Sequence, residues 1–272
     1  MADWIVDVII GFVEGLTEFL PISSTGHLII TRGLLDLEGE IGFRQLIVVQ
    51  GAAILAVCWE YRRRLWTIGT TLLSDRQSRL FTLNLFLAFL PAAVVGLAFE
   101  DTIRSVLFAP IPVALALVIG GILILWAERR THAERVTSID QLLPLDAFKV
   151  GLFQMLALIP GASRSAATIL GGLLTGLSRK TAAEFSFFVA IPVILTATGY
   201  KLLDVREPIS ADEARSTLLS GIVAFLAALI AIRLLIRYIS QHSFAIFAWY
   251  RIALGGFIVL SWQFGWVSWG SS

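Results

Sequence analysis

Residues 14–27, EGLTEFLPISSTGH, gather groups that could do acid–base or nucleophilic chemistry within an otherwise apolar region. Glu14 and Glu18 are four residues apart, so on a helix they share one face and repel each other unless a positive charge lies between them. Proteins typically hold Mg²⁺ with one or two carboxylates, while substrate phosphates and water complete its shell. The pair therefore predicts a divalent-cation site or acid–base work. The structural alternative is that one glutamate caps a helix or pairs with an arginine.

The second half of the same stretch supplies hydroxyls and an imidazole. Ser23, Ser24 and Thr25 come just before His27. An imidazole beside hydroxyls could activate one of them as a nucleophile or shuttle a proton. The alternative is a core histidine bonded to a backbone carbonyl, with serines satisfying the backbone at a helix break. We favour function, because ionisable groups at membrane depth are costly and mark functional sites.

A second segment, PGASRSAAT at residues 160–168, has the composition of an anion-binding loop. Small residues let the backbone approach a ligand, N–H groups and hydroxyls can point at it, and the following helix offers its N-terminus. Arg164 supplies a planar fork that matches phosphate oxygens; alternatively, it only neutralises a glutamate. The other residues expected to bind an anion here are Gly161, Ser163, Ser165 and Thr168.

One further arginine lies inside an apolar segment. Arg251 and Arg164 are the only two arginines placed in this way. Arg251 could bind an anionic ligand, or it could form a salt bridge to Glu184 or to an acid of the first segment. Gln50, Glu184 and Ser186 lie near the starts of the apolar spans that follow the two polar segments, so they could line the same cavity.

These residues must be positioned by helices in a membrane. The chain has 272 residues, of which 57% are hydrophobic and 15% charged, whereas an average soluble domain has about 25% charged residues. Apolar runs of roughly 17 to 22 residues recur, which is the length of a membrane-crossing helix. The single cysteine, Cys58, excludes an internal disulfide and a cysteine-based metal site. Nothing indicates nucleic-acid binding or an organic cofactor.

The two polar segments lie in interrupted apolar stretches. Residues 5–35 and 150–176 contain proline and glycine near their middles, so each fits a re-entrant helix, loop and helix better than a single span. Non-helical backbone at membrane depth must be buried in protein or line a cavity. Six transmembrane helices are expected besides, at residues 45–60, 82–99, 111–127, 184–203, 217–236 and 245–268.

The order of these elements predicts an inverted repeat. A re-entrant element followed by three spans occurs twice, in residues 1–127 and 150–272 of a single membrane domain, and the odd number of spans reverses the second copy. LPISST at 20–25 and IPGASRS at 159–165 are weak echoes of each other. Interrupted segments in corresponding halves indicate a site near the bilayer midplane. The predicted fold is an all-α polytopic membrane protein with an inverted 3+3 repeat.

The loops predict the orientation of the chain in the membrane. Thirteen of the 21 lysines and arginines fall in the loops 61–81, 128–149, 177–182 and 233–244. The positive-inside rule places these loops in the cytoplasm. Both termini are then expected on the outer side.

The polar segments together resemble a known family, the undecaprenyl pyrophosphate phosphatases of bacterial inner membranes. EGLTEFLPISSTGH at 14–27 and PGASRSAATI at 160–169 are close to that family's motifs, YR at 250–251 is a smaller match, and the similarity covers essentially the whole chain. The resemblance implies hydrolysis of a polyprenyl diphosphate to the monophosphate and inorganic phosphate. It also implies recycling of the lipid carrier for cell-wall polymers and tolerance to bacitracin.

The resemblance further implies two re-entrant elements in inverted repeats, an inner-membrane location and an active site open to the periplasm. In this sequence, Glu14 and Glu18 would serve catalysis and hold a divalent cation, Mg²⁺ or Ca²⁺. Ser24 and His27 would be the nucleophile and its proton partner, in either order. With Arg164, these four form the expected catalytic set. The expected substrate-binding set is Ser23, Thr25, Gln50, Gly161, Ser163, Ser165, Thr168 and Arg251.

Two other functions stay open. Inverted repeats with broken helices are also transporter architecture, so the main alternative is a secondary transporter or lipid-carrier flippase, alone or as a second activity. The other is a phosphatidic-acid-type phosphatase, because TGH at 25–27 resembles the context of its histidine, although its lysine-arginine-proline motif is absent. The expected partner is a polyprenyl diphosphate lipid, and a homodimer is also possible.

Overall fold

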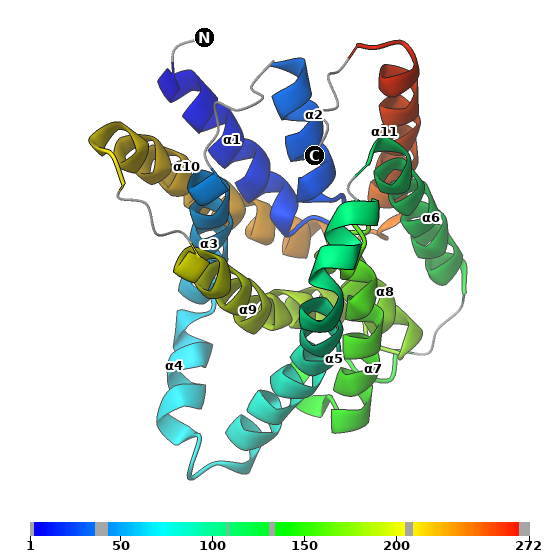
Figure 1. Cartoon of the computed structure of the whole chain (residues 1–272). Helices are drawn as coiled ribbons and strands as arrows, with labels where there is room; N and C mark the ends of the chain where they lie inside the picture. The colour runs from blue at the N-terminus through cyan, green and yellow to red at the C-terminus, as the bar shows by residue number, and fades with distance from the viewer. Residues whose placement is uncertain (1–2, 36–42, 108, 131–133, 205–208, 267–272) are drawn as a thin grey trace.

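The structure is a computed structural model of the chain, in which residues 3–35, 43–107, 109–130, 134–204 and 209–266 are described (Figure 1). Within these ranges the chain forms eleven α-helices and two short 3₁₀ segments. The one β-type contact there is an isolated bridge between Val136 and Leu177. The predicted all-α class is confirmed.

The helices form two groups, one ending at Arg129 and the other beginning at Pro144. The first group is α1 (Asp3–Glu18), α2 (Ser24–Leu34), α3 (Phe43–Glu60), α4 (Arg62–Thr71), α5 (Arg76–Leu107) and α6 (Pro110–Arg129). The second group is α7 (Pro144–Gln154), α8 (Arg164–Leu174), α9 (Arg179–Asp204), α10 (Ala211–Ile239) and α11 (Ala245–Gln263). The 3₁₀ segments are Ile139–Gln141 and Met155–Leu158.

Five of the described helices are long and apolar enough to cross a membrane. They are α6, α10 and α11, together with α5 over Arg76–Phe99 and α9 over Arg179–Leu203. They correspond to five of the six expected spans; residues 267 and 268 of the last one lie outside the described residues. The remaining expected span, 45–60, is the 18-residue helix α3, which is not among these five. The chain is therefore a multi-pass membrane protein.

Both polar segments are broken helices. The breaks, residues 19–23 between α1 and α2 and residues 159–163 before α8, each contain a proline, Pro21 or Pro160. Proline has no backbone N–H and disfavours helical backbone in the residue before it, which fits the end of helical structure at Glu18 and Leu158, shortly before these prolines. The interruptions expected from composition are confirmed.

The helices that follow the two breaks begin in the same way. Ser23 and Ser163 precede α2 and α8, and they are the only non-glycine residues with positive φ in the described part, at 73° and 69°. Each serine hydroxyl accepts a hydrogen bond of 3.3 Å from the backbone N–H three residues later, which is Gly26 in α2 and Ala166 in α8. A serine in this position satisfies one of the free donors of a helix N-terminus. The two breaks thus share one local construction.

Each broken segment packs on a helix of the other group. α1 lies mainly against α10, and α7 lies mainly against α5. The approach is close because glycines lie at the crossings: a Cβ added to Gly15 would collide with the backbone of Ala224, and one added to Gly151 would collide with that of Ala88. The groups also meet where α6 packs on α11, where α3 packs on α10 and α9, and, less extensively, where α6 meets α8 and α5 meets α9. These pairs hold both breaks in the interior.

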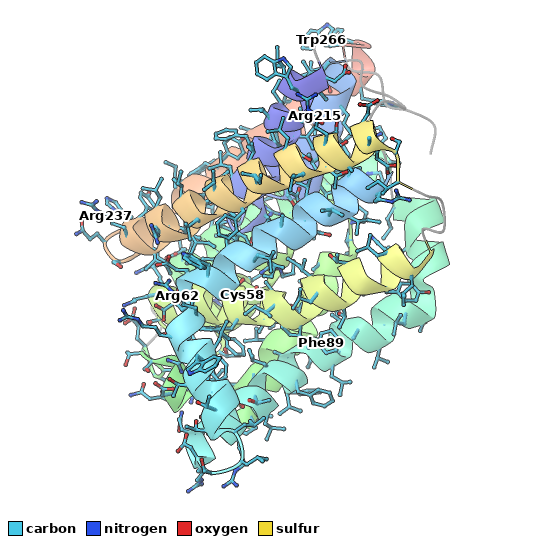
Figure 2. All side chains as sticks on the ribbon, turned by 90° about the vertical axis from the view of Figure 1, so that its left-hand side faces the viewer. Cys58, Arg62, Phe89, Arg215, Arg237 and Trp266 are labelled. Atoms are coloured by element: carbon cyan, nitrogen blue, oxygen red, sulfur yellow. The ribbon has the colours of Figure 1, made fainter. Side chains whose placement is uncertain are left out.

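Basic residues lie at the helix ends. Figure 2 shows Arg62 and Arg237 at one end of the long helices and Arg215 at the other. Arg179 at the start of α9 pairs with Glu128 at the end of α6, at 2.6 Å. Charged side chains therefore anchor the ends of helices whose middles are apolar.

The glycine crossing generates a stability prediction. In Gly15→Ala the new Cβ must displace α10, so we expect a loss of about 1–3 kcal/mol of folding free energy, measured as a lower Tm of the purified protein in detergent. Gly199→Ala is the matched control, because a Cβ there meets nothing within 4 Å and alanine favours a helix by about 1 kcal/mol over glycine. Equal Tm values for both variants would contradict the close packing of α1 on α10.

Candidate active site

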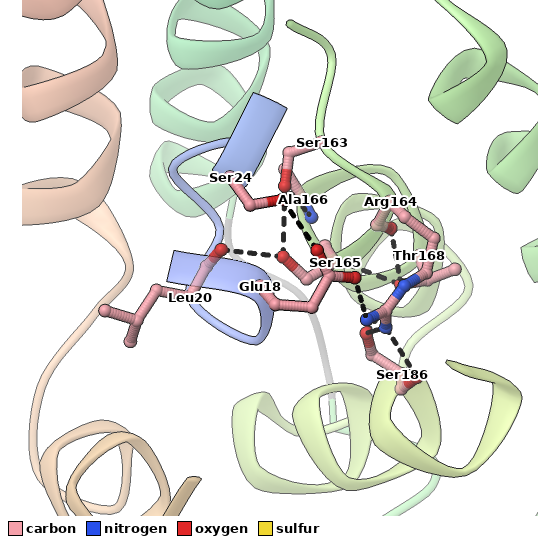
Figure 3. A network of polar contacts seen from close by, with 9 residues as sticks. All are labelled: Glu18, Leu20, Ser24, Ser163, Arg164, Ser165, Ala166, Thr168 and Ser186. Atoms are coloured by element: carbon pink, nitrogen blue, oxygen red, sulfur yellow. Dashed lines mark hydrogen bonds and ion pairs between the residues drawn. The ribbon is translucent and has the colours of Figure 1, made fainter. Parts of the chain in front are cut away.

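A buried ion pair joins the two polar segments. Arg164 Nη2 lies 3.1 Å from Glu18 Oε1, and the two side chains are only 9% and 7% exposed. Glu18 is the last residue of α1, and Arg164 is the first residue of α8 (Figure 3). Because a buried charge is costly unless it is paired, this contact ties the two breaks together. The two segments singled out in the sequence converge on one site.

Ser24 supplies a second hydrogen-bond donor to the Glu18 carboxylate. Its Oγ donates a hydrogen bond of 2.6 Å to Glu18 Oε2, a length typical of a hydroxyl bonded to an ionised acceptor. Each oxygen of Glu18 therefore has one donor, Arg164 on Oε1 and Ser24 on Oε2. The hydroxyl hydrogen of Ser24 points at a carboxylate that can accept it as a base.

The Arg164 guanidinium is held on its other sides by α9 and by an aromatic ring. Nη1 donates to the Ser186 carbonyl at 3.0 Å and lies 3.3 Å from its hydroxyl. Thr168 Oγ1 lies 2.7 Å from the same hydroxyl, and the guanidinium carbon lies 5.6 Å from the centre of the Phe19 ring. These contacts fix the orientation of a fork that could bind phosphate oxygens.

Ser163 and Ser165 connect the second break to the backbone of the first. Ser165 Oγ donates to the Leu20 carbonyl at 2.8 Å and lies 3.0 Å from Ser163 Oγ. The N-termini of α2 and α8 follow directly on these contacts, as Figure 3 shows. Free N–H groups of a helix N-terminus favour anions, so the cluster can receive negative charge from two helices.

Glu14 lies one turn before Glu18 in α1 and is 3% exposed. Its Oε2 is buried and has no hydrogen-bond partner in the described part of the chain. An orphaned acceptor beside a second carboxylate fits a divalent cation, which proteins hold with one or two carboxylates. No cluster of three or more potential metal ligands occurs among the described residues. The rest of such a cation's shell would come from substrate and water.

His27 is not bonded to Ser24 or to Glu18. Its Nδ1 lies 2.7 Å from the Ser23 carbonyl, and its Nε2 lies 2.7 Å from the Tyr250 hydroxyl. The alternative of a histidine bonded to a backbone carbonyl thus describes one of its two contacts. Tyr250 was missed as a site residue by sequence reasoning; the signal that could have found it was its place beside Arg251 in the YR match.

Arg251 is fully buried and contacts both breaks. The salt bridge to Glu184 or to an acid of the first segment, one of the two expected alternatives, is wrong, because every acceptor of Arg251 in the described part is a backbone carbonyl. The carbonyls belong to Pro21 in the first break, Gly161 and Ala162 in the second, and Ala116 and Leu117 in α6, at 2.9–3.3 Å. Carbonyls left free by broken helices need donors when buried, and the sequence carries no signal for such acceptors.

The remaining candidates are Gly161, Thr25 and Gln50. Gly161 has φ of 90°, and a Cβ there would collide with the Val113 carbonyl of α6, so only glycine fits without strain. Thr25 and Gln50 are partly buried, and neither makes a side-chain hydrogen bond to the cluster in the described part. The roles of Thr25 and Gln50 in binding substrate therefore stay predictions.

The fold and this centre define a multi-pass α-helical membrane protein with a buried polar site between two broken helices. The model of one family, described as bacitracin resistance protein BacA, matches residues 7–257. The chain belongs to this family, and the resemblance that the motifs indicated is confirmed.

Similar proteins share nearly the full length. The undecaprenyl-diphosphatase of Dechloromonas aromatica (strain RCB) is 52% identical over 264 residues, covering 97% of this chain and 96% of the relative. That of Laribacter hongkongensis (strain HLHK9) is 51% identical over 272 residues, covering 99% and 100%. Undecaprenyl-diphosphatase 2 of Rhodospirillum rubrum is 54% identical over 264 residues, covering 97% and 96%.

The Arg251 contacts generate a second stability prediction. Arg251→Met keeps much of the volume but removes all donors to the five carbonyls, and one hydrogen bond to a charged group contributes about 1.5–3 kcal/mol. We expect the Tm of the purified protein to fall far below that of Arg237→Met, a control at an exposed position. A Tm equal to that of the control would contradict the role of Arg251 in holding the breaks.

Proposed function

We propose that this chain hydrolyses undecaprenyl diphosphate, or a related polyprenyl diphosphate, to the monophosphate and inorganic phosphate. This reaction would return the lipid carrier to cell-wall polymer synthesis. Membership of the bacitracin resistance family and the near full-length similarity to proteins named undecaprenyl-diphosphatase support the proposal. The single observation that carries the mechanism is the Ser24–Glu18–Arg164 arrangement at the junction of the two breaks.

In the proposed reaction Ser24 is the nucleophile and Glu18 its base. Ser24 Oγ attacks the terminal phosphorus while Glu18 accepts the hydroxyl proton. The hydrogen bond of 2.6 Å from Ser24 Oγ to Glu18 Oε2 supports this proton transfer. The bond from phosphorus to the bridging oxygen breaks, and the polyprenyl monophosphate leaves. Water then attacks the phosphoserine, Ser24 regains a proton, and inorganic phosphate is released. The contacts of His27 favour Ser24 over His27 as the attacking group.

The rest of the site would neutralise and orient the diphosphate. Phosphoryl transfer depends mainly on positioning and on stabilising negative charge. The Arg164 fork and the N-termini of α2 and α8 can receive phosphate oxygens, and the hydroxyls of Ser163 and Thr168 lie within the same network. On binding, the diphosphate would share Arg164 with Glu18.

A divalent cation, Mg²⁺ or Ca²⁺, is part of the proposal. Glu14 and Glu18 would hold it, and the free, buried oxygen of Glu14 supports this assignment. When bound, the cation would supply positive charge to the diphosphate oxygens. Two adjacent carboxylates could then stay ionised in the interior.

The proposed architecture is an inverted repeat of two re-entrant elements and six spans, with the site open to the periplasm. The matching serines at the breaks and the packing of each broken segment on the other half support the symmetry. The same symmetry would suit a lipid-carrier flippase. The hydroxyl that Ser24 directs at Glu18 favours hydrolysis, because transport alone needs no such pair.

The central pair gives the first activity prediction. Glu18→Ala and Arg164→Ala should each abolish phosphate release from a short-chain prenyl diphosphate in detergent. The double variant Glu18→Ala/Arg164→Ala, which leaves neither charge unpaired, should be inactive while the protein stays folded. The double control Glu60→Ala/Arg233→Ala removes another glutamate–arginine pair, at 2.8 Å with Arg233 58% exposed, and should keep near-normal turnover. Near-normal turnover in either site variant would refute the role assigned to that residue.

Removal of the divalent cation gives the second activity prediction. A chelator should stop phosphate release, and added Mg²⁺ should restore it. Glu14→Gln should raise the Mg²⁺ concentration for half-maximal activity by roughly tenfold or more, because one of two anionic ligands is lost. Glu60→Gln should leave this concentration unchanged. Turnover that is insensitive to the chelator would overturn the cation assignment and leave the phosphatase proposal standing.

The prenyl substrate is tested separately. Phosphatidic acid in its place should release no phosphate.

A further inference from the structure

Tyr250 of α11 is the partner of the second ring nitrogen of His27. The hydroxyl lies 2.7 Å from Nε2, and the two rings are nearly parallel, 3° apart, with centroids separated by 5.5 Å. The first ring nitrogen, Nδ1, lies 2.7 Å from the Ser23 carbonyl. Both nitrogens of His27 therefore have protein partners.

These two partners determine which nitrogen of His27 can exchange a proton. A carbonyl oxygen only accepts, so Nδ1 must carry a hydrogen for the bond to Ser23 to form. Any proton that His27 gains or loses must then be exchanged at Nε2. A tyrosine hydroxyl both donates and accepts, so it can bond to Nε2 when His27 is neutral and when it is charged.

The contact between Tyr250 and His27 lies next to a buried anchor, although Tyr250 itself is 45% exposed. The next residue along α11, Arg251, is fully buried and donates to carbonyls of both breaks and of α6. α11 also packs along α6. Arg251 thus ties the backbone of α11 at Tyr250 to the first break, and the hydrogen bond to Nε2 places the Tyr250 hydroxyl beside His27.

We propose that Tyr250 is a positioning residue for His27: its hydroxyl keeps the imidazole in one orientation, with Nδ1 on Ser23 and Nε2 as the only site of proton exchange. This inference rests on the proposed hydrolysis. Ser24 already has Glu18 as its base, so proton transfer by His27 would fall in the second half of the proposed reaction, when water attacks the phosphoserine. Tyr250 acts on that step only through His27.

Tyr250→Phe tests this proposal with the smallest possible change, since it removes the hydroxyl and keeps the ring. We expect kcat for a short-chain prenyl diphosphate to fall about tenfold or more, a part of the hundredfold or greater contribution of a positioned acid–base group. KM should stay within about twofold, because Tyr250 does not hold the substrate. An unchanged kcat would overturn the proposal.

The chain contains a matched control. Tyr238 lies beside His242 with ring centroids 4.5 Å apart, but the imidazole bonds to the Tyr238 backbone carbonyl, not to its hydroxyl. Tyr238→Phe should therefore leave kcat and KM unchanged. If both tyrosine variants lose activity equally, a general effect of removing hydroxyls explains the loss, and the proposal fails.

A double-mutant cycle separates positioning from a merely structural role. If Tyr250 acts through His27, Tyr250→Phe should lower kcat in the wild-type background and have no further effect in His27→Gln. Equal losses in both backgrounds would show that Tyr250 acts independently of His27 and would overturn the proposal.

Side-chain nitrogen NMR on protein labelled at histidine gives a readout that needs no turnover. The His27 signals, identified as those lost in His27→Gln, should show a protonated Nδ1 in the wild type and in Tyr238→Phe, and they should shift in Tyr250→Phe. Identical His27 signals in wild type and Tyr250→Phe would refute the positioning role. If the wild type does not hydrolyse the prenyl diphosphate but the His27 signals shift in Tyr250→Phe as expected, the proposed function is refuted and the positioning role of Tyr250 is not.

Discussion

The buried ion pair between Glu18 and Arg164 is the interaction on which the rest of the structure depends. Removing one partner of such a pair leaves an uncompensated charge and costs about 3–5 kcal/mol, so two segments 146 residues apart in the chain must meet for either to be tolerated inside a membrane protein. The glycine crossings of α1 with α10 and of α7 with α5 bring them together. Long apolar helices are thus packed in the arrangement that brings two polar breaks to one point.

Breaking a helix frees two kinds of backbone group, and this protein uses them differently. Carbonyls of the breaks at Pro21, Gly161 and Ala162 accept hydrogen bonds from Arg251, a buried cation. The N–H groups at the starts of α2 and α8 are only partly satisfied, by Ser23 and Ser163, and they favour an anion. One arginine therefore stabilises the scaffold, while the other faces the position where a diphosphate would bind.

Much of the fold could be predicted because membrane helices follow simple rules of length, hydropathy and proline placement. The helix breaks around Pro21 and Pro160 and the convergence of Glu18 with Arg164 could be inferred from polar residues that need partners. The carbonyl acceptors of Arg251 and the contact of Tyr250 with His27 could not, because backbone carbonyls have no sequence signature and α11 is distant in the chain.

The central claim is that both breaks bind one diphosphate. The most direct measurement is an experimental structure of the protein with a non-hydrolysable prenyl diphosphonate. The account predicts that the diphosphonate lies within hydrogen-bond reach of Ser24 from the first break and of Arg164 from the second at the same time. A diphosphonate bound to residues of one break only, or away from the Glu18 carboxylate, would contradict it.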